Sequence, residues 1–111
     1  MDSEQAVSAL AALAQGHRLA IFRLLVQAGP EGLAAGAIAE ALGLPNSSLS
    51  FHLAQLNQAG LIGQARRSRS LIYSADFAAM NALVAYLMEN CCRGSGACAP
   101  AADCASDPVP A

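Results

Sequence analysis

Glycine and proline divide the first ninety residues of this chain into short apolar segments, and this division limits the folds open to it. Gly16, Gly29-Pro30, Gly43 and Gly60 each interrupt a run of apolar residues. Glycine ends helices because it reaches left-handed backbone angles, and proline does so because it lacks an amide hydrogen. Between the breaks, apolar residues recur at spacings of three and four, which is typical of helices. The helices predicted in this way cover residues 3–14, 16–26, 34–42 and about 46–59.

The last two of these helices form a helix-turn-helix pattern, because a turn of three or four residues containing Gly43 joins them. Asn46 or Ser47 can cap the later helix. Leucines at spacings of four and three, Leu49, Leu53 and Leu56, mark its inner face. The side chains expected near or on its outer face are Ser47, Ser48, Ser50, Phe51, His52 and Gln55.

A β-hairpin and a final helix follow. Residues 61–66 and 70–74 are predicted strands, joined by the turn Arg67-Ser68-Arg69. Asp76 can cap a helix with apolar residues at helical spacing, which we expect to end at Cys91-Cys92. The predicted fold class is therefore mainly α with a β-hairpin. We expect one domain over residues 1–92 and a flexible cysteine-containing tail, rich in Gly, Ser and Pro, over 93–111.

Basic charge is concentrated at the hairpin. The chain has a net charge of −2, which at first argues against a nucleic-acid partner. However, three of its six cationic side chains, Arg66, Arg67 and Arg69, fall within four residues. A local basic tip on an acidic body can still engage phosphate.

The apolar share of the sequence, 55%, does not indicate a membrane protein. Much of it is alanine, and no stretch reaches the roughly 18 apolar residues that a spanning helix needs. The N-terminal residues 1–5 are acidic and polar and so lack the features of a secretory signal. We therefore expect a cytoplasmic protein with no membrane partner. The sequence contains no catalytic motif, so we do not expect an enzyme.

All four cysteines lie in the last twenty-one residues, as the vicinal pair Cys91-Cys92 followed by Cys98 and Cys104. Thiols gathered in such a segment have no core to fill. In a reducing compartment, grouped cysteines are more often metal ligands or redox sensors than structural disulfides. A soft-metal site, a redox pair and a tail disulfide all remain open on this ground.

Three segments resemble the ArsR/SmtB family of metal-sensing repressors. Residues 47–62, Ser-Ser-Leu-Ser-Phe-His-Leu-Ala-Gln-Leu-Asn-Gln-Ala-Gly-Leu-Ile, look like the recognition-helix signature of that family. Residues 13–21 are similar to its Leu-Ala-x-x-x-Arg-Leu-x-Ile segment, and residues 66–73 resemble its wing. The resemblance covers roughly residues 8–88. It implies a winged helix-turn-helix fold and a homodimer that occupies operator DNA and leaves it when a metal or metalloid binds.

For such a protein, two groups of residues are candidates for contact with double-stranded operator DNA. The first half of the helix over 46–59 would enter the major groove, where base edges are distinguishable, or would bond phosphate. The candidates on it are Ser47, Ser48, Ser50, His52 and Gln55. DNA contact and internal support are equally open for His52. Arg66, Arg67 and Arg69 would contact phosphate or the minor groove.

The sensing site implied by the resemblance lies near the C-terminus. The helix over 34–42 contains no thiol, so the site of the best-known arsenic sensors cannot be carried over, and the last helix lacks the ligands of zinc sensors. A subgroup of arsenic-responsive members uses a vicinal pair and a third cysteine, which implies Cys91, Cys92 and Cys98 as ligands. Trivalent arsenic or antimony would be the inducer, and no organic cofactor is implied.

Other thiol chemistries stay open. Four thiolates, with Cys104 added, would suit tetrahedral zinc or cadmium. A disulfide from Cys98 to Cys91 or Cys92 would make a redox-sensing repressor. A protein that merely buffers soft metal is a further alternative. An arsenate reductase is disfavoured, because no phosphate-cradling loop surrounds any cysteine.

Overall fold

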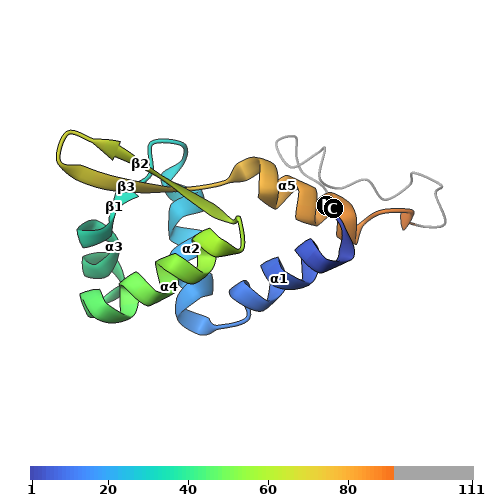
Figure 1. The fold of residues 1–111 in the computed structure, drawn as a ribbon, viewed down its shortest axis with the longest axis horizontal. Helices are drawn as coiled ribbons and strands as arrows, with labels where there is room; N and C mark the ends of the chain where they lie inside the picture. The colour runs from blue at the N-terminus through green and yellow to red at the C-terminus, as the bar shows by residue number, and fades with distance from the viewer. Residues whose placement is uncertain (92–111) are drawn as a thin grey trace, which may run out of the picture.

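The computed structural model describes residues 1–91. Figure 1 shows five helices and a small antiparallel sheet within that range. The helices are α1 (Ser3–Leu13), α2 (Gly16–Ala28), α3 (Ala35–Leu42), α4 (Asn46–Gln58) and α5 (Phe77–Leu87). The strands are β1 (Leu33–Ala34), β2 (Ile62–Arg67) and β3 (Ser70–Ala75). The winged helix-turn-helix fold class predicted from the sequence is confirmed, but β1 was not predicted.

The ends of the helices follow from local backbone bonds. At the start of α1, Asp2 Oδ1 accepts from the Gln5 amide at 2.8 Å, and Gln5 Oε1 accepts from the Asp2 amide at 2.9 Å. Asp76 caps α5 as predicted, with Oδ1 3.0 Å from the Ala79 amide nitrogen. Gly43 ends α3 in the left-handed conformation, at φ 67°. The prediction for the start of α4 was wrong: Pro45 is the capping residue, without a side-chain bond, and Asn46 already lies in the helix.

The hydrophobic core is built around α2. Its fully buried Ile21 and Leu25 share a single cluster with Ile38 of α3 and with Leu49 and Leu56 of α4. Because α2 therefore supports both helices of the helix-turn-helix, it fixes their relative position. Each such side chain contributes about 1.5–3 kcal/mol when it leaves water.

Helix α1 packs through alanine. Its buried residues are Ala6, Ala9 and Ala12, one every three residues, whereas the larger Val7 and Leu10 are exposed. Small side chains allow the backbone of α1 to approach its neighbours closely, so the alanine stripe faces inward and the larger residues are left outside. Val7 is 62% exposed.

The sheet has the strand order β1-β3-β2 and is antiparallel throughout. In the hairpin, Arg67 pairs with Ser70, so the turn consists only of Ser68 and Arg69, with Ser68 at φ 56°. On the other side of β3, Leu33 pairs with Tyr73. The middle of β3 is thus paired with the segment that leads directly into α3.

Helix α5 is shorter than predicted. It ends at Leu87, and Asn90 has a φ of 60°, so Cys91 lies beyond the helix. The Cys91 amide donates to the Met88 carbonyl at 2.9 Å and closes a turn that contains Asn90. The predicted extension to Cys91-Cys92 fails because the last turn tightens and the left-handed residue then redirects the chain. The predicted tail, residues 93–111, lies outside the described residues, as does Cys92.

No single helix among residues 1–91 is long and apolar enough to cross a membrane. Only α1 and α2 taken together reach that threshold, and they are bent by 101° to each other.

His52 is the one buried polar side chain recorded in the core of residues 1–91, at 9% exposed. Its Nδ1 lies 3.4 Å from Arg18 Nη1. A guanidinium only donates, so Nδ1 accepts and Nε2 carries the hydrogen of the neutral ring. Burial, the positive charge of Arg18 and the neighbouring His17 all lower the pKa of His52 below its ordinary value. At neutral pH the folded protein therefore favours the neutral form of His52.

Gly32→Ala tests the pairing of β1 with β3. Gly32 has a φ of 70°, and an added Cβ would press on the Tyr73 carbonyl oxygen and lie 3.0 Å from Ile72 Cγ2. Both the backbone strain and the clash are unfavourable, so the free energy of unfolding should fall by about 2–4 kcal/mol. Gly36→Ala is the matched control: it lies in α3, has open space around it, and should raise stability by up to about 1 kcal/mol. Urea unfolding of both variants measures the difference, and equal stabilities would refute the assigned pairing.

The pH dependence of stability tests the state of His52. Because its pKa is lower in the folded chain, the unfolded chain binds the extra proton first as the pH falls below about 6.5. The stabilising contribution is complete above that pH and should be lost progressively as the pH falls further. His52→Gln should flatten this part of the curve, whereas His17→Gln removes only the smallest of the three causes and should leave most of the slope. Urea unfolding at a series of pH values gives both curves, and an unchanged slope in His52→Gln would contradict the assignment.

Candidate nucleic-acid interface

The outer face of α4 is small and polar at its N-terminal half. Ser47, Ser48 and Ser50 are all exposed, as predicted for residues that read or bond DNA. They sit within the first turn and a half of the helix, where unpaired amides and the helix dipole favour a negative group. This end of α4 therefore offers hydroxyl and amide donors without a competing charge.

The hairpin carries exposed positive charge. Arg66, Arg67 and Arg69 are all exposed. Arg66 and Arg67 are neighbours on β2, so their side chains leave opposite faces of the ribbon, and Arg69 lies in the turn. The guanidinium groups thus surround the hairpin tip.

The N-terminal end of α4 and the tip of the hairpin lie at the same end of the molecule (Figure 1, left), whereas α1 and α5 lie together at the opposite end. Between α4 and the sheet is a hollow of about 250 Å³ with Ser50 and Asn57 on one side and Gln64 and Tyr73 on the other. A polar helix face, a polar hollow and a basic tip are therefore continuous along one side of the chain.

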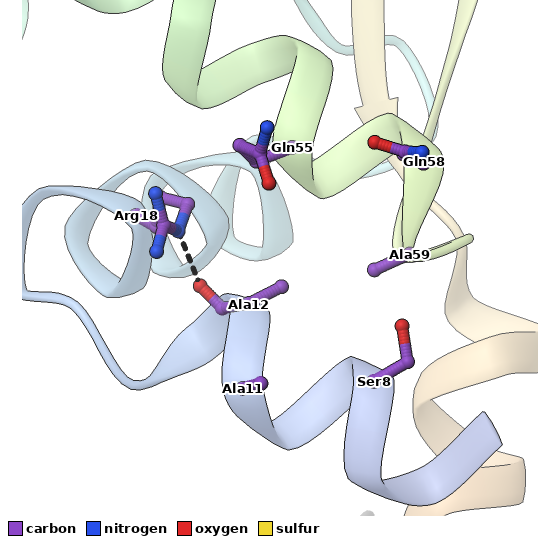
Figure 2. A pocket seen from close by; sticks show the side chains of 7 residues that line it. All are labelled: Ser8, Ala11, Ala12, Arg18, Gln55, Gln58 and Ala59. Atoms are coloured by element: carbon purple, nitrogen blue, oxygen red, sulfur yellow. Dashed lines mark hydrogen bonds between the residues drawn. The ribbon is translucent and has the colours of Figure 1, made fainter. Parts of the chain in front are cut away.

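Two α4 residues that we expected to contact DNA, His52 and Gln55, do not lie on this outer face. His52 falls three residues after Leu49, on the stripe that also buries Leu53 and Leu56, so the alternative of internal support fits its position. Gln55 is half-buried and faces the Arg18 side chain across a pocket (Figure 2). The period of the leucines could have indicated the inward direction of His52.

Phe51 is the outer-face residue that the candidate list left out. Its ring is 57% exposed, beside the serines and 5.7 Å from the His52 ring centroid. We expected it near or on the outer face, and the structure leaves it exposed there. An exposed aromatic ring among serines is an apolar contact point on an otherwise polar surface.

Cys91 is the one predicted metal ligand within the described residues, where it is half-buried after α5. Cys92 and Cys98, and the spare Cys104, lie outside them. In the range 1–91, His, Cys, Asp and Glu do not form any group of three that could hold a metal ion. The predicted thiol site thus stays a prediction.

Comparison with known proteins agrees with this geometry. A protein family described as "Helix-turn-helix domain" matches residues 13–64. The HTH-type transcriptional regulator YgaV of Escherichia coli (strain K12) is 36% identical over 91 residues, which span 82% of this chain and 90% of YgaV. This relative belongs to a class of regulators without enzymatic activity, in accord with the absence of a catalytic motif.

Two solved structures extend the likeness to the fold. An ArsR-like transcriptional regulator from Rhodococcus sp. RHA1 has a TM-score of 0.68 and 26% identity, over 76% of each chain. The homodimeric winged helix-turn-helix DNA-binding domain of Mb0332 from Mycobacterium bovis, a possible ArsR-family transcriptional regulator, has a TM-score of 0.62 and 32% identity, over 78% of this chain and 81% of that one. Given its helix-turn-helix, its hairpin and these relatives, the chain belongs to the ArsR-like family of helix-turn-helix transcriptional regulators.

Proposed function

We propose that this chain is a cytoplasmic homodimeric repressor that binds double-stranded operator DNA and is released when trivalent arsenic or antimony binds its C-terminal thiolates. The DNA-binding part of this proposal is supported by one observation: the N-terminal end of α4 and the tip of the hairpin lie at the same end of the molecule (Figure 1). The clustering of all four cysteines in the last twenty-one residues supports the sensing part.

On DNA, α4 lies in the major groove and the hairpin reaches the flanking backbone. Helix α4 spans thirteen residues, or about 20 Å, which is long enough to cross the groove. Ser47, Ser48 and Ser50 then meet base edges or phosphates, and the Phe51 ring can contact the methyl group of thymine. Arg66, Arg67 and Arg69 supply the phosphate contacts that make binding strong and salt-dependent.

Dimerisation uses the opposite end of the molecule. Val7 and Leu10 on α1 are exposed, and Leu87 at the end of α5 is 56% exposed. Apolar residues gathered on two adjacent helices favour burial against a second copy. The Mb0332 domain, to which this chain is similar, is homodimeric, which supports a dimer but not a particular interface. A dimer presents two α4 helices, which suits two half-sites about 34 Å apart.

Thiolates are the ligands that suit a soft metalloid. Three of them favour the pyramidal coordination of trivalent arsenic or antimony, and we assign Cys91, Cys92 and Cys98 to it, with Cys104 spare. Cys91 lies four residues after the end of α5, the helix that contributes Leu87 to the proposed dimer surface. An ion bound there acts on DNA affinity only if it binds the free and DNA-bound dimers unequally.

The salt dependence of DNA binding tests the role of the hairpin. If six arginines of the dimer neutralise phosphates, log K falls with log salt at a slope of about −5 or steeper. Replacing all three with glutamine should flatten the slope by about 5, and Arg67→Gln alone by about 2. Arg23→Gln, an exposed α2 residue with the same charge change, is the control and should keep the slope. Fluorescence anisotropy on a duplex selected from a random-sequence pool gives the slopes, and equal slopes for Arg67→Gln and Arg23→Gln would refute the hairpin assignment.

Ion-dependent release from the same duplex tests the sensing site. Arsenite or antimonite should release the wild-type dimer. Loss of a ligand should raise the required concentration at least about tenfold in Cys91→Ser, Cys92→Ser and Cys98→Ser, because even groups that merely support ligands cost 10–100-fold. Cys104→Ser is the matched control and should respond like wild type.

The same assay separates the rival thiol chemistries. Release by peroxide but not by arsenite would replace metalloid sensing with a disulfide switch. Release by cadmium or zinc that needs Cys104 would indicate four-thiolate coordination. Failure to select any duplex would refute the repressor itself and leave a metal-buffering protein.

A further inference from the structure

A pocket of about 320 Å³ opens between α1, α2 and α4 (Figure 2). Arg18 enters it from α2, Ser8 lies on the α1 side, and Gln55 and Gln58 line it from α4. Within residues 1–91, the pocket lining includes neither the serines and arginines of the proposed DNA surface nor Cys91. Nothing in the proposed function uses it.

The Arg18 guanidinium is only partly satisfied by its protein partners. Its Nε donates to the Ala12 carbonyl at 2.7 Å, and its Nη1 lies 3.4 Å from His52 Nδ1. A guanidinium has five N–H donors, so three remain. Among the described residues, no carboxylate lines the pocket and none forms a recorded ion pair with Arg18. Within residues 1–91, the negative end of the α1 helix dipole, at the Ala12 carbonyl, is the recorded partner that favours this positive charge.

The remaining lining adds further donors. The side-chain amides of Gln55 and Gln58 and the hydroxyl of Ser8 face the pocket, and no hydrogen bond within residues 1–91 is recorded for these three side chains. The other lining residues are alanines, whose small side chains leave the space open. A positive guanidinium fork surrounded by neutral donors is the arrangement that binds carboxylate or phosphate oxygens.

We propose that this pocket binds a small oxyanion, a carboxylate or a phosphate, with Arg18 as its main contact. The volume lies at the lower end of the range for ligand pockets, which suits a small metabolite. Such a ligand would bridge α1, next to the proposed dimer surface, and the C-terminal half of α4. It would therefore join the two helices whose relative position sets the spacing of the two α4 helices in a dimer.

Solution NMR on the full-length ¹⁵N-labelled protein tests the site without DNA. Sodium phosphate and sodium succinate are titrated separately, with sodium chloride holding the ionic strength constant, and the Arg18 Nε–Hε resonance is followed. At least one of them should shift this resonance saturably, with a Kd on the order of 1–10 mM. The two titrations show whether phosphate or carboxylate is preferred. Because no DNA is present, the result stands whether or not the repressor function holds.

Gln55→Glu provides the decisive variant, because it places an internal carboxylate in the pocket at nearly constant shape. It should weaken binding at least about tenfold, since that carboxylate competes for Arg18. Gln27→Glu makes the same charge change at an exposed α2 position and should bind like wild type. A shift that stays linear to 100 mM with both anions, or equal affinities in Gln55→Glu and Gln27→Glu, would overturn the proposal.

Discussion

The burial of one stripe of α4 is the constraint on which the rest of the structure depends. Leu49, His52, Leu53 and Leu56 face inward together against the core centred on α2. A helix rotated by even one residue, or about 100°, would bring serines into the core and leave leucines in water. The same burial that stabilises the fold therefore selects which side chains face outward, and this face carries the serines and Phe51.

A polar bridge accompanies that apolar contact. Arg18 connects the Ala12 carbonyl of α1 to His52 of α4, and burial lowers the pKa of His52, which favours the neutral ring that can accept from the guanidinium. A charged and a titratable group thus lie where three helices meet. Such networks specify a single arrangement more strictly than leucines do, because each donor has only certain acceptors within reach.

Most of the fold was predictable from the sequence because residues that end or begin helices stand at nearly every boundary. Gly43 and Asp76 end and begin helices as expected, and the arginine hairpin was placed within one residue. β1 could not be predicted, because two residues show no alternation and only pairing with β3 makes them a strand. The inward alanine face of α1 was missed because alanine is a weak apolar signal beside Val7 and Leu10. In the candidate site, the exposure of the serines and arginines was predictable from the sequence. The inward positions of Gln55 and His52 were not, because they depend on packing beside Arg18.

The pairing of β1 with β3 has a mechanical consequence. Because Ala34 is the last residue of β1 and Ala35 the first of α3, there is no linker between the sheet and the helix-turn-helix. The hairpin is therefore joined through β1 directly to α3, the first helix of the helix-turn-helix, so the hairpin and α4 move as one unit. If the proposed ion site beyond α5 moves one protomer relative to the other, the hairpin and α4 of each protomer rotate together. The angle between the two protomers then changes, with the geometry inside each preserved.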